Sequence, residues 1–298
     1  MARGFIQRAK LAFLVCFGFC CSSIIAASSE IKCGLRNIEL IKKQSKSYAL
    51  SIEESPSDFG EYPWTIDISK NDQPYCVGSL IHPKVVLTSR SCAISLNSND
   101  FMVSAGVWDR EGDNWHFLAQ SRGIDKIIAD PVLIPGGQEV SLLFLKEPFA
   151  LAAHINTVCL PPSDYVIGES RFCYGSGWGG YKVYSSGNRV MKRILMVTVD
   201  SETCKNQMFK NIKNSIFCAA GLSGNDTTCL RDLGGPLVSR ISLQPQTPDQ
   251  YHQIGIMLFG KDLCFSETPG AYIDVAKSRV WIDKKMKENG LDSTTYTA

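Results

Sequence analysis

The sequence predicts an all-β protein, either a barrel or a sandwich, from the spacing and composition of its apolar segments. Short apolar or alternating runs recur between turn signals from Phe59 onward, as is typical of strands, whose side chains point alternately to two faces. Their spacing and β-branched content argue against alternating strand and helix units. The runs are WTIDI, KVVLTS, FMVSAGV, GIDKIIA, VSLLFL, RILMVTV, QIGIMLF and GAYIDVA.

Two helices are expected beside these strands. A short helix begins near the capping residue Ser201. A terminal helix lies within KSRVWIDKKMKENG, and Asn289 and Gly290 end it, because these residue types are common just after a helix.

The composition is that of an ordinary globular protein. The chain has 298 residues, of which 44% are hydrophobic and 20% are charged, so it can bury a sizeable core. The formal net charge of +2 and the lack of a long single-sign run favour neither nucleic acid nor an anionic membrane surface as a partner.

The N-terminus has the pattern of a secretory signal peptide, which we assign to residues 1–27. Basic residues precede an apolar run from Leu11 to about Ile25, and the small residues Ala26 and Ala27 follow it. The alternative is an anchor that stays in the membrane, but the run is shorter than the roughly 20 apolar residues that a spanning helix needs. We therefore expect a secreted, extracellular protein with no membrane span in its mature chain.

The rest of the chain divides into an arm and a domain. Residues 28–57 are polar and lysine-rich with one cysteine, Cys33, and are expected to form an extended N-terminal arm tied down at that point. Residues 58–298, which hold the predicted strands, are expected to form one domain.

Nine of the twelve cysteines follow the predicted leader and are expected to form disulfides in an oxidising compartment. Because nine is odd, at least one thiol is unpaired or pairs between chains. Zinc is the rival interpretation, but the nine contain no CxxC pair and do not cluster with His82, His116, His154 or His252, so neither a metal nor another cofactor is expected. The nine are Cys33, Cys76, Cys92, Cys159, Cys173, Cys204, Cys218, Cys229 and Cys264.

Six stretches, in order along nearly the whole mature chain, resemble the chymotrypsin-like (trypsin-type) serine proteases. The resemblance implies that residues 58–298 fold into two six-stranded antiparallel β-barrels with a C-terminal helix, and that the functional cleft lies between the barrels. The stretches are CVGSLIHPKVVLTSRSC, EVSLLFL, HINTVCLPPS, FCYGSGWGG, TCLRDLGGPLVS and GIMLFG…PGAYIDVAKSRVWI.

Carried over residue by residue, the resemblance puts Ser91 at the general base, Glu139 at the acid that orients the base and Leu233 at the nucleophile. Ser91 cannot take a proton as an imidazole does, and Leu233 has no lone pair to attack with. Arg231 stands where a glycine N–H helps to bind the oxyanion. The expected protein is therefore not an enzyme. The retained scaffold of the loop is Asp232, Gly234, Gly235 and Pro236.

A serine-type endopeptidase with relocated machinery is a minor alternative. The resemblance places Ser89 and Ser91 near the cleft, but a serine needs a base, and all the histidines fall outside the matched catalytic stretches.

The resemblance also concerns activation. Active relatives are cut after a basic residue, and the new N-terminal ammonium pairs with the aspartate that precedes the nucleophile. Here the junction falls near Leu50 and Ser51, with no Arg or Lys immediately before it. Because an unpaired buried carboxylate is costly, Asp232 is expected to bind Arg231, another cation or backbone donors.

The resemblance assigns four disulfides. A fifth family pair would join Cys173 to the position of Ser239, so Cys173 is left over. We favour a buried, inert thiol over an intermolecular bond for Cys173. The four pairs are Cys76–Cys92, Cys33–Cys159, Cys204–Cys218 and Cys229–Cys264.

The pocket positions also differ from those of the resembled proteases. Thr227, at the pocket floor, lacks the negative charge that selects Lys or Arg, and the strand that binds a substrate backbone reads Leu258, Phe259, Gly260. The sequon at Asn225 predicts a glycan beside the pocket.

Stretches such as FGEYPW and HINTVCLPP look most like arthropod serine protease homologues, the inactive relatives of clip-domain proteases, although the segment before Cys33 is too short for a clip module. This implies a secreted non-catalytic cofactor, decoy or adaptor in an extracellular protease cascade, of the immune and melanisation type or in reproductive fluid. Its partner would be a protease, a zymogen or a cascade substrate. The alternative is a recognition protein that binds a microbial or cell-surface ligand.

Overall fold

The computed structural model describes residues 32–36, 56–93, 100–112, 117–130, 139–179, 189–207, 213–222, 232–241, 250–260 and 269–298. The chain divides into Met1–Glu30 and Ile31–Ala298, and every described residue belongs to the second unit. The predicted signal peptide lies outside the described residues.

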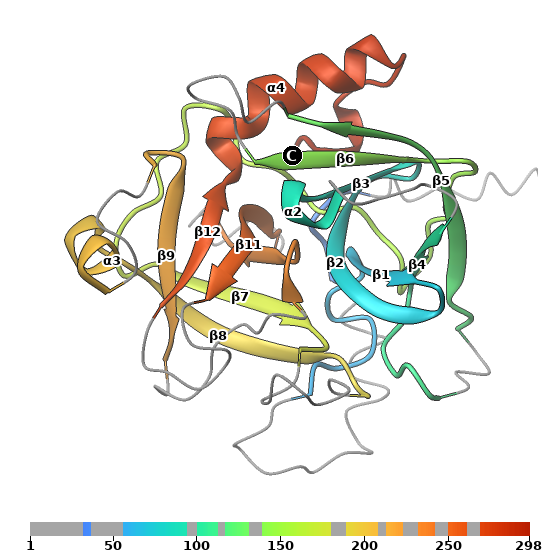
Figure 1. The fold of residues 1–298 in the computed structure, drawn as a ribbon, viewed down its shortest axis with the longest axis horizontal. Helices are drawn as coiled ribbons and strands as arrows, with labels where there is room; N and C mark the ends of the chain where they lie inside the picture. Colours follow the sequence, from blue (N-terminus) through green and yellow to red (C-terminus); the bar gives the residue numbers. More distant parts are fainter. Residues whose placement is uncertain are drawn as a thin grey trace, which may run out of the picture. The chain divides into compact units, whose positions relative to one another are not determined.

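The first six strands form a closed antiparallel barrel (Figure 1). They pair in the order β1-β2-β3-β6-β5-β4, and β1 closes the barrel against β4. Apolar side chains such as Ile66, Leu80 and Leu143 fill the interior. The strands are β1 (Thr65–Lys70), β2 (Gln73–His82), β3 (Val85–Ser89), β4 (Phe101–Ala105), β5 (Gln120–Ala129) and β6 (Val140–Leu145).

The second barrel repeats this topology. Its strands pair in the order β10-β11-β12-β9-β8-β7, and β10 closes against β7. β8 alternates between buried and half-buried residues along its whole length, as the period of two in a strand requires. The strands are β7 (Phe172–Gly177), β8 (Lys192–Val199), β9 (Ile216–Gly221), β10 (Pro236–Ser239), β11 (His252–Gly260) and β12 (Gly270–Asp274). The predicted fold class, two six-stranded antiparallel barrels with a C-terminal helix, is confirmed.

The C-terminal helix α4 (Val275–Glu288) is capped at both ends. The Asp274 side chain accepts a hydrogen bond from the Ala276 N–H at 3.0 Å, and Gly290 adopts a φ of 74° after the helix. In Figure 1 this helix follows β12 directly. No helix among the described residues has the length and apolarity needed to cross a membrane.

The short helix α3 (Ser201–Gln207) begins where the sequence predicts, but Asp200 supplies the cap. Its carboxylate accepts hydrogen bonds from the Thr203 N–H at 2.7 Å and the Thr203 hydroxyl at 2.6 Å, and these bonds lower the pKa of Asp200. Two further short helices, α2 (Arg90–Ala93) and η3 (Thr294–Tyr296), were not predicted because a single turn leaves no periodicity in a sequence.

A hydrophobic cluster joins the two barrels and α4. It contains Trp64 and Val77 from the first barrel, Val238 and Ile256 from the second, and Ile282 from the helix. Burial of apolar surface is the main favourable contribution to folding. The seam between the barrels, where these side chains meet, is therefore part of the hydrophobic core.

Two pairs of buried polar side chains bridge this seam. The Ser79 hydroxyl donates to Gln253 Oε1 at 2.6 Å, and the Thr65 and Ser176 hydroxyls lie 2.8 Å apart. Each pair joins one barrel to the other, and each satisfies groups that would be costly to bury alone.

The described part of the arm, residues 32–36, is bound to the domain. A disulfide joins Cys33 to Cys159. The Gly34 N–H donates to the Thr157 carbonyl, and the Tyr251 N–H donates to the Gly34 carbonyl, both at 2.8 Å. Gly34 has a φ of 69°, and a Cβ there would lie 2.2 Å from the Tyr251 carbonyl oxygen, so this close approach requires glycine.

Two more disulfides, Cys76–Cys92 and Cys204–Cys218, lie one in each barrel. The fourth expected pair, Cys229–Cys264, lies outside the described residues. Cys173 is a buried free thiol, and burial raises its pKa to about 12, which keeps it protonated and unreactive.

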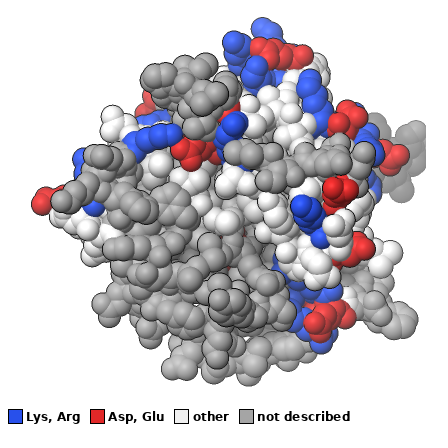
Figure 2. Space-filling view, in the orientation of Figure 1, with Lys and Arg blue, Asp and Glu red and all other residues white. Residues whose placement is uncertain are grey.

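On the described part of the face in Figure 2, basic and acidic side chains are intermixed. Charged residues are numerous on α4, where Lys285 and Glu288 form an ion pair at 2.8 Å. Such exposed pairs contribute little to stability individually.

Acid should destabilise the fold through His252, which is 6% exposed at the start of β11. Burial lowers its pKa from 6.5 to about 4, so the unfolded chain binds more protons than the folded chain between these values. The free energy of unfolding should therefore fall by about 3 kcal/mol from pH 7 to pH 4 on account of this residue. Urea unfolding at several pH values should show a flatter profile for His252→Gln, and an equally steep profile would contradict the assignment.

Restoring the missing cysteine should add a disulfide. Val238 pairs with Tyr174 and Leu237 with Gly175, so the same register sets Ser239 opposite Cys173. Ser239→Cys should bond to Cys173 and stabilise the oxidised protein by about 2–4 kcal/mol, largely by restricting the unfolded chain. Thiol titration of the denatured protein and urea unfolding with and without reductant would measure this. Ser239→Ala is the control, and a Cys173 thiol that still titrates in the oxidised variant would contradict the prediction.

Candidate functional site

Ser91 lies in the one-turn helix α2, directly after β3, and its side chain is exposed. Its hydroxyl lies 2.8 Å from that of Ser89, which is fully buried at the end of β3. Either hydroxyl can donate this hydrogen bond to the other, but neither is a base at neutral pH.

Glu139 immediately precedes β6 and adopts a φ of 53°, which is uncommon for a residue with a side chain. Its carbonyl accepts from the Arg90 N–H at 2.7 Å. Its carboxylate binds Lys213 Nζ at 2.6 Å, and the Glu139 and Lys213 side chains are 25% and 49% exposed. Lys213 lies between α3 and β9, so this partly exposed ion pair runs from one barrel to the other.

Leu233 is half-buried and packs against the apolar interior of the first barrel. Its carbonyl accepts from the Val77 N–H of β2 at 2.9 Å. The side chain expected at the nucleophile position therefore packs among apolar side chains.

The turn from Asp232 to Gly235 is held by both barrels. The Gly234 N–H donates to the Met257 carbonyl and the Gly235 N–H to the Asp232 carbonyl, both at 2.9 Å. Gly234 has a φ of 78°, and a Cβ there would lie 2.1 Å from Thr88 Oγ1. Only glycine fits this position. Pro236 follows and begins β10.

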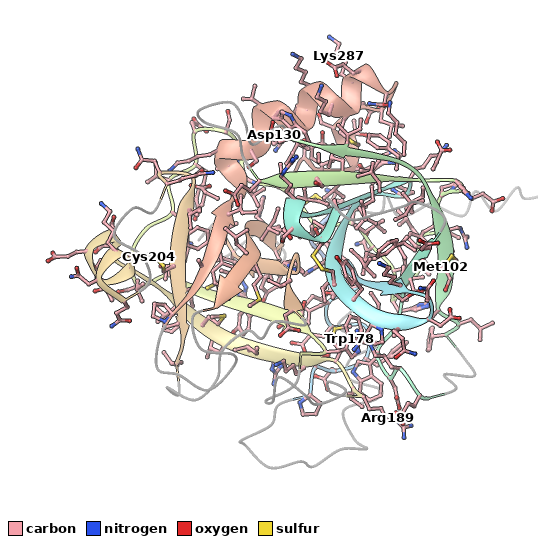
Figure 3. The ribbon with its side chains drawn as sticks, in the orientation of Figure 1. Met102, Asp130, Trp178, Arg189, Cys204 and Lys287 are labelled. Carbon is pink, nitrogen blue, oxygen red and sulfur yellow. A yellow bond between two sulfur atoms is a disulfide. The ribbon has the colours of Figure 1, made fainter. Side chains whose placement is uncertain are left out.

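Asp232 is only 2% exposed, and its carboxylate has partners. Oδ1 accepts from the Gly179 N–H at 2.7 Å, and Oδ2 lies 3.5 Å from Lys192 Nζ. Between Gly177 and Gly179 lies Trp178, labelled in Figure 3, which is fully buried. The expectation of another cation or backbone donors for Asp232 did not identify Lys192. Arg231, the other expected partner, lies outside the described residues.

A sequence signal for Lys192 did exist. In β8 the buried face is formed by Lys192, Ile194, Met196 and Thr198, so a lysine stands on a face where no other residue is charged. A charged residue on the apolar face of a strand indicates a buried partner.

The histidines lie on other elements. The His82 ring accepts from the Lys84 N–H at 3.0 Å, His154 stacks on Phe59 at a centroid distance of 5.7 Å, and His252 begins β11. Burial lowers the pKa of all three. His116 lies outside the described residues. Within the described ranges, no three acidic, histidine or cysteine side chains gather as metal ligands.

The predicted pocket is described only in part. Leu258 is 8% exposed and belongs to the cluster between the barrels, while Phe259 and Gly260 pair with Ala271 and Gly270 of β12. Thr227 and the sequon at Asn225 lie outside the described residues.

The family model described as Trypsin matches residues 51–282. Phenoloxidase-activating factor 2 of Galleria mellonella is 32% identical in an alignment of 269 residues that covers 82% of this chain and 87% of that protein. Inactive CLIP domain-containing serine protease A8 of Anopheles gambiae is 28% identical in an alignment of 273 residues that covers 85% of this chain and 71% of that protein. With two closed barrels and a match over most of its length, the chain belongs to the trypsin family.

Proposed function

We propose that this chain is a secreted, non-catalytic serine protease homologue that acts as a cofactor, decoy or adaptor in an extracellular protease cascade. The observation that carries the proposal is Leu233, an apolar side chain at the expected nucleophile position. The turn that holds it keeps its backbone hydrogen bonds to both barrels. A leucine cannot form the covalent intermediate of the serine protease reaction.

The other two triad positions support the same conclusion. Ser91 has a hydroxyl partner in Ser89, and the Glu139 carboxylate binds Lys213. A hydroxyl nucleophile at neutral pH needs a base that is itself oriented by an acid. The side chains of Ser91, Glu139 and Leu233 do not form such a hydrogen-bonded series.

The similar proteins favour a role in a cascade. One is named as an activating factor for phenoloxidase and the other as an inactive CLIP domain-containing serine protease. A protease, a zymogen or a cascade substrate is therefore the partner that we propose. The leader predicted at residues 1–27 and the three disulfides support an extracellular location.

A fluorophosphonate probe and a broad peptide panel would test the absence of catalysis. We expect neither labelling nor turnover, before or after trypsin treatment, while trypsin itself is labelled completely. Leu233→Ser should also stay unlabelled, because Ser91 still cannot accept the proton. Stoichiometric labelling of a serine in the natural chain would show that a different nucleophile and base act in this protein.

Capture from haemolymph or another secretory fluid would test the partner. The immobilised chain should recover a protease or its zymogen, and the added chain should change the rate at which that protease cuts its substrate by at least two-fold. Trypsin with a blocked nucleophile is the matched control, since it has the same fold. Recovery of only glycans or cells would instead favour a recognition protein, and an unchanged cleavage rate would exclude a cofactor.

A further inference from the structure

The carboxylate of Asp232 lies in a site shaped to hold it. Lys192 Nζ faces Oδ2 at 3.5 Å, and the Lys192 and Asp232 side chains are only 9% and 3% exposed. A Cβ on Gly177 would lie 2.2 Å from Oδ1, and a Cβ on Gly179 would lie 2.3 Å from Oδ2. The space for the carboxylate therefore depends on two glycines, and its charge is balanced by a lysine. We call Lys192, Gly177 and Gly179 the carboxylate site.

The register of the second barrel places Lys192 there. In the β7–β8 pairing Lys192 stands opposite Gly177, and the alternation of β8 turns Lys192 to the buried face. Burying an ammonium without an anion beside it is costly, because the ammonium loses its contact with water.

Asp232 transmits this anchoring to the turn. Its carbonyl accepts from the Gly235 N–H, the Leu233 carbonyl accepts from Val77 of the first barrel, and the Gly234 N–H donates to Met257 of the second. The backbone of the turn is thus hydrogen-bonded to both barrels, and the Asp232 side chain anchors the turn to Lys192 and Gly179.

The ion pair between Lys192 and Asp232 is present in the uncut chain. Pro56 forms a single β-bridge with Lys192, and the Ser57 N–H donates to the Met191 carbonyl at 2.8 Å. Both residues follow the expected junction near Leu50 and Ser51, and they lie beside a lysine whose ammonium already binds Asp232.

We propose that Lys192 supplies, from within the uncut chain, the buried ammonium that fixes the turn from Asp232 to Gly235. The turn then takes its final form on folding, and no proteolytic cut is needed to order it. The inference concerns the regulation of this turn and stands whether or not the proposed cascade role is correct.

Hydrogen exchange at the amides of Val77, Gly234 and Gly235 tests this directly. In Lys192→Met, which keeps an unbranched side chain one atom shorter and removes the charge, these amides should exchange at least ten-fold faster. Lys213→Met removes a partly exposed ion pair and is the matched control, with less than a two-fold change expected. Equal exchange in the natural chain and Lys192→Met would overturn the proposal.

Two further measurements keep the test decisive if Lys192→Met unfolds. In Asp232→Asn, which keeps the size of the side chain and removes the anion that Lys192 binds, the same amides should exchange at least ten-fold faster; exchange equal to that of the natural chain would contradict the proposal. A Leu50→Arg chain, cut by trypsin to release Ser51, should show exchange at the turn within two-fold of the uncut chain. A ten-fold slowing on cutting would show that the new N-terminus, and not Lys192, orders the turn.

Discussion

The turn that carries Leu233 is constrained by the burial of one carboxylate, that of Asp232. Asp232 is held by Lys192 and by the Gly179 N–H, and its own turn is bonded to both barrels. Breaking a buried ion pair by removing one partner typically costs on the order of 3–5 kcal/mol, because the remaining charge is left without compensation. The position of Leu233 therefore depends on the buried carboxylate of the preceding residue, Asp232.

The scaffold of the turn and the chemistry of its side chains are physically independent. Gly234 is required by backbone geometry, with Thr88 too close for any Cβ, and this requirement is the same whatever side chain stands at position 233. Leucine suits that position because it packs against the first barrel. A protease fold can thus keep its geometry after its reactive groups change, which is why function has to be argued from the site and not from the fold.

Apolar packing joins the two barrels, and hydrogen-bonded polar pairs between them define their relative position. Trp64 and Ile256 belong to one cluster, while Ser79 and Gln253 must meet at hydrogen-bond distance. Apolar contacts tolerate small shifts, whereas a buried hydroxyl that misses its partner incurs its full desolvation cost. These pairs therefore help to fix how one barrel sits on the other, and with it the placement of Leu233 relative to Ser91 and Glu139.

The sequence by itself determined the features that arise from local order. Alternation along runs such as RILMVTV predicts strands, and Asn289 and Gly290 predict the end of α4. The ordered stretches predict two barrels through resemblance, and the same resemblance assigns the substituted triad positions.

Only the tertiary structure decided which distant side chains meet. Lys192 and Asp232 are 40 residues apart, and Glu139 and Lys213 are 74 apart, so no local pattern pairs them. Which cation neutralises a buried carboxylate depends on strand register and on the packing of one barrel against the other. Strand periodicity is a property of neighbouring residues, whereas charge pairing is a property of the closed barrel, and for that reason the sequence indicated that Asp232 needs a partner but not that Lys192 provides it.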